Sequence, residues 1–128
     1  KKYASDLYPK NDIELAKAMQ WSVWAISEIE PLQMQIVIQN FFSGGNPDQG
    51  IISNATEQLQ RPLQVLDTHL ADADYLLGNA FTVADLNLAG VMLLLQMVKF
   101  DLSNHTNASD WLSRCYSREA LKRAQALD

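Results

Sequence analysis

Residues 83–100 restrict the fold more than any other part of the chain, because this segment is apolar on nearly every side when it is drawn as a helix. A surface helix carries an apolar stripe and a polar face, so a helix that is apolar all round has to be covered by other elements. The segment is too short to cross a membrane. Its longest apolar run covers residues 88–95, whereas a span needs about 20 residues. It therefore predicts the buried central helix of a bundle in a protein without a membrane partner.

A threonine and an aspartate mark where this central helix begins. Thr82 supplies a hydroxyl at the expected N-cap position, and Asp85 supplies a carboxylate three residues later. In a capping box, two such side chains accept hydrogen bonds from backbone N–H groups at the start of the helix. Phe81 and Leu86 flank the pair and can form a hydrophobic staple. A catalytic role for Thr82 and Asp85 is the alternative, and structural capping is favoured because their spacing fits it.

The rest of the chain also has the period of helices, with apolar residues recurring every three or four positions. Asn11 and Glu14 have the spacing of a helix start, and Pro31 is expected to bend or split the long helix that follows. Pro62 is expected to kink a second long helix without ending it. No strand-like alternation is present, so the sequence predicts an all-α fold, a helical bundle of about five helices. The expected helical segments are residues 11–42, 52–73, 83–100, 109–115 and 117–126, with a turn-rich loop at 43–50.

The composition argues against several kinds of partner and ligand. The net charge is −5, so the chain as a whole repels phosphate backbones, and no nucleic-acid partner is expected. Cys115 is the only cysteine and no secretory leader is evident, so a reducing, cytoplasmic location is expected, with Cys115 as a small buried residue. His69 and His105 have no further ligands at metal-binding spacing, so no metal site is expected.

The first long helix has two faces of different character. One face repeats large apolar residues at helical spacing and is assigned to the core, although its two tryptophans could instead form a ligand box. The other face mixes polar and apolar residues, which suggests that it lies at the surface or borders a site. The core face consists of Trp21, Trp24, Ala25, Ile29, Leu32 and Ile36, and the mixed face consists of Val23, Ser27, Glu30 and Met34.

Three pieces of sequence together carry a resemblance to a known family. They are Tyr75-Leu76-Leu77-Gly78, then the segment Phe81-Thr82-Val83-Ala84-Asp85-Leu86, and finally Trp111-Leu112-Ser113-Arg114. In this order, after a leucine-striped helix, they resemble the helical C-terminal domain of the cytosolic glutathione S-transferases. The resemblance extends over essentially all of residues 1–128, in which residues 1–10 would be the tail of an upstream linker or helix.

The resemblance implies a function that this chain cannot perform alone. In the family, an N-terminal thioredoxin-like domain binds most of the co-substrate glutathione and supplies the residue that activates its thiol. The helical domain contributes one wall of the site for a small hydrophobic electrophile and part of a homodimer interface. By similarity, Ser27 would contact glutathione across the dimer and Glu30 would face the reacting thiol, with Val23 and Met34 beside them as substrate-binding residues. The alternative is that these four residues form a solvated surface beside a partner domain.

Two other functions stay open at this stage. The same helical domain occurs in elongation factor gamma subunits and in synthetase-associated scaffolds, where it would be a non-catalytic interaction module. A freestanding bundle that carries a small molecule is a third option. Sequence upstream of Lys1 would discriminate among them, because a thioredoxin-like half with a Ser, Tyr or Cys near its start supports the enzyme.

Overall fold

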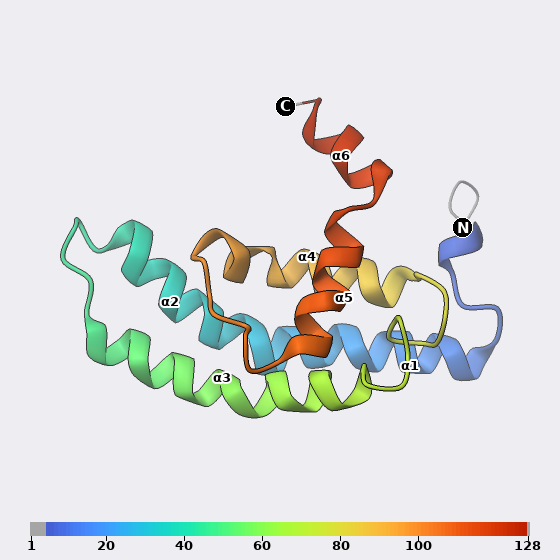
Figure 1. The fold of residues 1–128 in the computed structure, drawn as a ribbon, viewed down its shortest axis with the longest axis horizontal. Coiled ribbons are helices and arrows are strands. Elements are labelled where there is room, and N and C mark those ends of the chain that lie inside the picture. Colours follow the sequence, from blue (N-terminus) through green and yellow to red (C-terminus); the bar gives the residue numbers. More distant parts are fainter. Residues whose placement is uncertain (1–4, 128) are drawn as a thin grey trace.

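A computed structural model describes residues 5–127, and these residues form a bundle of helices with no strand element, which confirms the all-α prediction (Figure 1). Residues 1–4 of the expected upstream tail lie outside the described part. No helix among residues 5–127 is both long and apolar enough to cross a membrane. In chain order the elements are the 3-10 turn η1 (Ser5–Leu7), α1 (Asp12–Trp24), the π-helical segment η2 (Ala25–Ile29), α2 (Glu30–Phe42), α3 (Gln49–His69), α4 (Val83–Met97), α5 (Thr106–Tyr116) and α6 (Glu119–Gln125).

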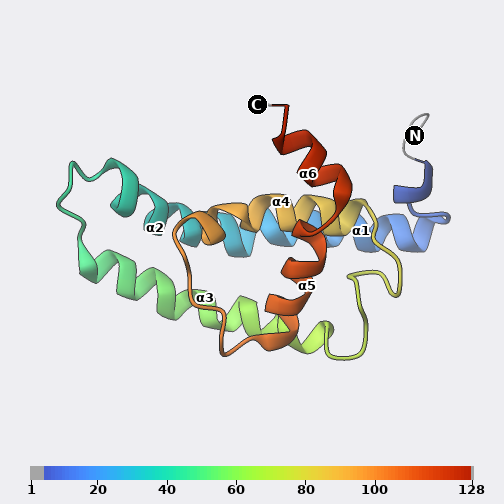
Figure 2. The same cartoon turned by 45° about the horizontal axis from the view of Figure 1, so that its top comes forward.

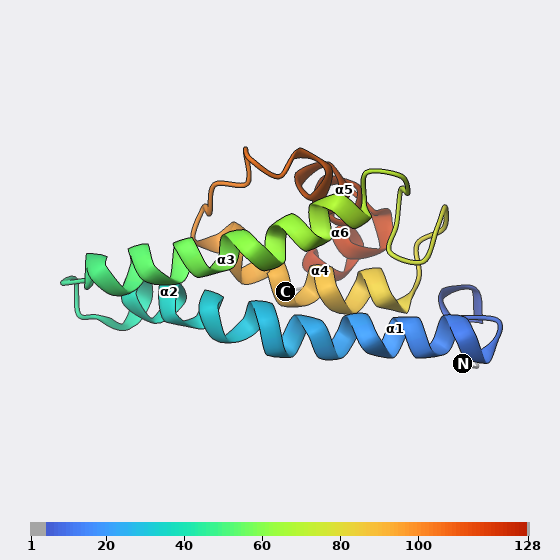
Figure 3. The same cartoon turned by 90° about the horizontal axis from the view of Figure 1, so that it is seen from below.

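The long first helix is divided into two by a π-helical turn just before Pro31. Pro31 has no N–H, and its ring crowds the carbonyl one turn earlier, so one α-helical hydrogen bond is lost at this point. The chain responds with a wider turn, in which the Glu30 N–H donates to the carbonyl of Ala25 five residues back. α1, η2 and α2 therefore form one rod along the base of the bundle (Figure 3). This is the split that the sequence predicted at the proline.

α3 returns alongside this rod and packs against α2 (Figure 3). It begins at Asp48, whose carboxylate accepts hydrogen bonds from the backbone N–H groups of Gly50 and Ile51. Its predicted leucine face is buried against the bundle, and the helix continues as one element through Pro62. The leucines of this face are Leu59, Leu63, Leu66 and Leu70.

α4 runs through the middle of the bundle, and α5 crosses it (Figure 2). The capping box is formed: the Thr82 hydroxyl accepts from the N–H of Ala84, and Asp85 accepts from the N–H of Thr82. However, α4 is covered on only one side. Leu86 is 50% exposed and Gly90 is also exposed, although the sequence predicted burial all round. The expectation was wrong on this side because η1 and α6 lie beside α4 there and leave a hollow instead of covering it.

Several helix ends differ from their expected positions by a few residues. α3 begins earlier than expected because Asp48 is its cap, and it stops at His69 rather than at residue 73. α4 ends at Met97 rather than at residue 100, and Lys99 follows with a positive φ of 54°. α5 begins earlier than expected, at Thr106. These shifts lie at helix termini, where local bonding decides the boundary.

Candidate functional site

Asp85 lies at the centre of a buried polar network that fixes the entrance to α4. Its Oδ1 accepts from the N–H of Leu76 at 2.9 Å and from the indole Nε1 of Trp111 at 2.8 Å, while its Oδ2 accepts from the N–H of Thr82 at 2.9 Å. The side chains of Asp85 and Trp111 are both fully buried. Every partner is a donor, so both carboxylate oxygens of Asp85 act as acceptors in the network. Its position inside the fold and its partners give it a structural role.

The uncovered side of α4 is an apolar surface that includes Leu86, Gly90 and Leu93. We call it the open face. A hollow of about 340 Å³ lies on it, between α4, α6 and η1. The Arg118 guanidinium lies 3.8 Å from the centroid of the Phe81 ring at one edge of the hollow, and the Tyr116 hydroxyl donates to the carbonyl of Ala89. The lining residues are Leu7, Phe81, Leu86, Ala89, Gly90, Leu93, Cys115, Tyr116, Arg118, Ala120, Leu121 and Ala124.

Two titratable groups of α5 that line the hollow are held in their neutral forms. Burial, together with the nearby Asp85 carboxylate, raises the pKa of the Cys115 thiol to about 12. Burial also raises the pKa of the Tyr116 hydroxyl, and the neighbouring Cys115 adds to the shift. A thiol with such a pKa carries almost no thiolate near neutral pH, so Cys115 is a packing residue and a poor nucleophile.

The four residues of the mixed face lie on both sides of the π-helical turn. Val23 is 63% exposed near the end of α1, and Ser27 is exposed within η2, where its hydroxyl donates to the Trp24 carbonyl at 3.4 Å. Glu30 and Met34 are partly buried on α2. The π turn adds one residue to the α-helical repeat, so these positions are not aligned as on a continuous α-helix. No hydrogen bond joins the side chains of any two of the four.

The residues of the expected core face of the first helix are not all buried to the same extent. Its aliphatic residues Ala25, Ile29 and Ile36 are buried, whereas Trp21, Trp24 and Leu32 are only partly buried against the core. The assignment of both tryptophans to the core was therefore too simple. They sit where α1 faces α3, at the edge of the bundle, so one side of each indole has no neighbouring helix to cover it.

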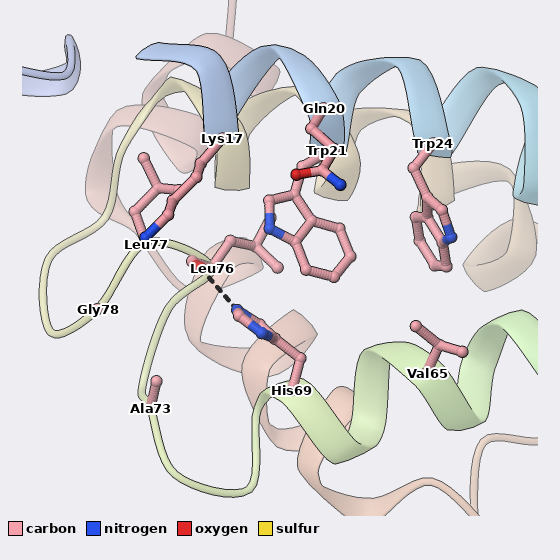
Figure 4. A pocket seen from close by; sticks show the side chains of 10 residues that line it. All are labelled: Lys17, Gln20, Trp21, Trp24, Val65, His69, Ala73, Leu76, Leu77 and Gly78. Carbon is pink, nitrogen blue, oxygen red and sulfur yellow. Dashed lines mark hydrogen bonds between the residues drawn. The ribbon is translucent and has the colours of Figure 1, made fainter. Parts of the chain in front are cut away.

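The two tryptophans instead line a pocket of about 530 Å³, which we call the α1–α3 pocket (Figure 4). The Trp21 and Trp24 rings meet edge to face with their centroids 5.2 Å apart, and the Trp21 centroid is 4.8 Å from that of His69. His69 Nε2 lies 2.7 Å from the carbonyl oxygen of Leu76, so this nitrogen donates and ties the loop after α3 to the helix. The lining residues are Lys17, Gln20, Trp21, Trp24, Val65, His69, Ala73, Leu76, Leu77 and Gly78.

Gln33 is among the buried polar residues that the sequence reasoning missed. Gln33 is fully buried on α2, and its Nε2 donates to the Val91 carbonyl of α4 at 2.8 Å. A signal existed, because Gln33 lies four residues after Ile29 and three before Ile36, which is the spacing of the core face. Because glutamine is polar, the apolar pattern did not predict that Gln33 is buried.

The two histidines have different neighbours and do not contact each other. His105 is buried at the start of α5 and bonds through Nε2 to Oε1 of Gln60, whereas His69 belongs to the α1–α3 pocket. Among residues 5–127 there is no group of three or more side chains of the kinds that hold a metal ion.

Comparison with known proteins identifies the family. The sequence model of the glutathione S-transferase C-terminal domain matches residues 29–119, and the chain belongs to that family, as its motifs suggested. It is 37% identical over 98 residues to glutathione S-transferase 3 of Zea mays, covering 69% of this chain and 42% of that protein. It is 27% identical over 122 residues to elongation factor 1-gamma of Artemia salina, covering 88% of this chain and 26% of that one.

A solved structure with the same fold is glutathione S-transferase-I bound with the ligand lactoylglutathione. The TM-score is 0.87 at 26% identity, and the match covers 99% of this chain and 64% of that one. The chain thus spans less than half of the Zea mays transferase and about two thirds of this structure.

Proposed function

We propose that this chain is the C-terminal helical part of a glutathione S-transferase-like enzyme that joins the glutathione thiol to a small hydrophobic electrophile. The observation that carries the proposal is the open face of α4. Leu86 and Gly90 are exposed there, Leu93 is half-buried, and an apolar hollow lies beside them, although a helix this apolar belongs inside a fold. The relatives in the family are more than twice as long as the matched segment. An N-terminal thioredoxin-like domain of the same protein is the proposed cover.

The division of labour follows from the chemistry that the described residues offer. Activating a thiol requires a group that stabilises the thiolate, and Cys115 and Tyr116, which line the hollow from α5, have raised pKa values and stay neutral. Thiol activation is therefore assigned to the N-terminal domain. The helical domain would act by binding the electrophile more tightly in the transition state than in the ground state, which changes rate and selectivity without acid–base chemistry.

The mixed face is proposed as the electrophile wall, with Val23 and Met34 as apolar contacts and Ser27 as a contact to glutathione of the partner subunit in a homodimer. Exposure of Val23 and Ser27 supports access to a ligand or to a second subunit. Glu30 has a different effect. A carboxylate within about 4–6 Å of the glutathione sulfur would raise the pKa of that thiol, so Glu30 tunes the site against thiolate formation unless a cation pairs with it.

The test is a steady-state analysis of the full-length protein with glutathione and 1-chloro-2,4-dinitrobenzene. Met34→Ala is expected to raise the KM for the electrophile several-fold and to leave the KM for glutathione unchanged, because only the apolar contact is lost. Ser27→Ala is expected to raise the KM for glutathione instead. Phe42→Ala is the matched control, since Phe42 is an exposed apolar residue at the far end of α2. Parental constants in Ser27→Ala, Glu30→Ala and Met34→Ala alike would remove the mixed face from the site.

The competing function is a non-catalytic interaction module. The match to elongation factor 1-gamma supports it, because that match covers most of this chain. The two functions differ in a simple measurement: a scaffold gives no conjugation of glutathione by the full-length protein with any of a panel of aryl halide, epoxide and enone electrophiles. Absence of turnover across that panel would favour the interaction module.

A further inference from the structure

We propose that Gln33 is a positioning residue for the electrophile, because its bond to α4 sets the direction in which Met34 points from α2. The inference rests on the proposed function, in which Met34 contacts the electrophile. Gln33 is fully buried, and its Nε2 donates to the carbonyl oxygen of Val91 at 2.8 Å. The bond joins two helices, since Gln33 lies in the first turn of α2 and Val91 lies in the middle of α4.

The place of Gln33 just after the π-helical turn explains why this bond matters. The wider turn η2 interrupts the regular α-helical bonding between α1 and α2, so contacts with neighbouring helices have to fix the rotation of α2. The apolar contacts of Ile36 and Val37 are non-directional, whereas a hydrogen bond tolerates only a narrow range of distance and angle. The bond from Gln33 therefore supplies the directional contact that sets how α2 is rotated against α4.

A second hydrogen bond joins α4 to the other side of the π turn. The Asn87 side-chain amide donates to the hydroxyl of Ser22 on α1 at 3.0 Å. Asn87 and Val91 are four residues apart, which places them one turn apart along α4 where it lies beside the rod (Figure 3). The two bonds thus span the π turn, and Ser22 and Gln33 each directly precede a residue of the mixed face.

Stability does not account for the buried amide of Gln33. Its Oε1 is also buried and has no hydrogen-bond partner among residues 5–127. A buried acceptor without a partner costs at least as much free energy as a typical hydrogen bond contributes, so the amide brings no net stability. The Val91 carbonyl lies inside α4 and keeps its helical hydrogen bond when Gln33 is replaced. An apolar side chain would suit this position at least as well, which leaves positioning as the role of the amide.

Rotation of α2 acts directly on the proposed electrophile wall. Around the helix from Gln33, Glu30 lies about 60° away and Met34 about 100° away in the same direction. Side chains reach about 5–6 Å from a helix axis, so a rotation of about 20° moves the end of Met34 by about 2 Å. A misplacement of about 1 Å can change a reaction rate as much as about 100-fold. Gln33 therefore controls selectivity through Met34 without touching the ligand.

The test compares two electrophiles in the full-length protein, the larger 1-chloro-2,4-dinitrobenzene and the smaller but-3-en-2-one. Gln33→Leu is expected to lower the ratio of their kcat/KM values about fivefold and to leave the KM for glutathione unchanged, because the wall contacts the larger molecule more extensively. Partial unfolding lowers both values equally and cannot change this ratio. Gln33→Asn, whose side chain is one methylene too short to reach Val91, should change the ratio in the same way. Gln35→Leu is the control, since Gln35 is exposed on α2.

A second measurement follows Met34 without any reaction. In protein labelled with ¹³C at the methionine methyl groups, the Met34 signal is assigned from its absence in Met34→Leu. Gln33→Leu should shift this signal, and Gln35→Leu should not. The melting temperature of Gln33→Leu should equal that of the parent protein or exceed it, because an unpaired buried acceptor is removed together with the bond.

Three results would overturn the proposal. The first is an unshifted Met34 signal in Gln33→Leu. The second is a melting temperature of Gln33→Leu far below that of the parent protein, because the amide would then serve stability. The third is a ratio that Met34→Ala changes and Gln33→Leu does not, which leaves the proposed function intact. An unchanged ratio in Met34→Ala itself would contradict the proposed function, and the role of Gln33 in the reaction would fall with it.

Discussion

The indole nitrogen of Trp111 on α5 donates to the carboxylate of Asp85 on α4 at 2.8 Å, and both side chains are completely buried. Asp85 also accepts from the backbone of Leu76 and of Thr82. One carboxylate thus joins the loop before α4, the first turn of α4 and the middle of α5. Hydrogen bonds to a buried charged group are stronger than ordinary ones, and losing the acceptor leaves several buried donors without partners.

Asp85→Ala is expected to lower the free energy of unfolding by about 2–5 kcal/mol, the sum of a lost cap and of unsatisfied buried donors. The melting temperature should fall by roughly 10 °C. Asp110→Ala is the control, because Asp110 is an exposed aspartate next to Trp111 and should have little effect on either quantity. Thermal unfolding followed by circular dichroism measures both. A variant that melts like the parent protein but has lost conjugating activity would mean that Asp85 acts in chemistry rather than in folding.

Trp111→Phe keeps an aromatic ring at this buried position and removes the indole donor together with part of the ring system. We expect it to cost about 1–3 kcal/mol of unfolding free energy, because the Asp85 carboxylate keeps its two backbone donors. In a double-mutant cycle with Asp85→Ala the two losses should be far from additive, since both remove the same bond. Additive losses in denaturant unfolding would show that the bond contributes little.

The Cys115 thiol is expected to be unreactive in the folded protein. Its pKa is raised to about 12 by burial, and its side chain is only 4% exposed, so neither thiolate nor access is available at pH 8. Labelling with a thiol-specific disulfide reagent should be slow in buffer and fast in denaturant. Rapid stoichiometric labelling of the folded protein, with the melting curve unchanged, would contradict this.

The same pKa has a consequence for alkaline stability. The unfolded thiol releases its proton near its ordinary pKa of 9.0, whereas the folded thiol, with its pKa raised to about 12, keeps its proton over that range. Between these values the folded state binds more protons than the unfolded state, so the free energy of unfolding falls as pH rises above 9. Cys115→Ala should make this decline shallower, as measured by urea unfolding at pH 8 to 10.5. An unchanged slope would show that the thiol does not contribute.

The open face predicts how the helical part behaves alone. With Leu86 and Leu93 on an apolar surface next to a hollow, residues 1–128 produced in isolation should self-associate. Leu86→Lys with Leu93→Lys should reduce self-association and, in the full-length protein, weaken contact between the two halves. Light scattering and protease susceptibility of the interdomain linker measure these effects. A monodisperse monomer from the unaltered fragment would argue against the open face as an interface.

Local signals in the sequence were sufficient for the helical elements, and long-range contacts were not. Thr82 and Asp85 lie three residues apart, so their capping role is visible in the sequence, and Pro31 shows where the first helix must change. The bond between Asp85 and Trp111 joins residues 26 positions apart and could not be inferred from spacing. The α1–α3 pocket depends on the loop after α3 folding back onto His69, which is again a contact that only the assembled chain reveals.

The sequence also could not predict that one side of α4 is exposed. An apolar residue that faces another domain has the same composition as one that faces the core of its own domain, so hydropathy does not separate Leu86 from Leu88. The π-helical turn before Pro31 could not be seen for a related reason: the periodic pattern of apolar residues tolerates one extra residue without losing its overall appearance.

The π turn between α1 and α2 determines which way the second half of the rod faces. Each residue of an α-helix rotates the chain by about 100°, so deleting one residue within Ala25–Ile29 would turn all of α2 by about that angle. Gln33, Ile36 and Val37 would leave the interior, and the neighbouring polar positions would replace them. The length of Ala25–Ile29 must therefore stay fixed if α1 and α2 are to pack in the same bundle. Point substitutions on the outer side of this segment do not rotate α2 and are tolerated more easily.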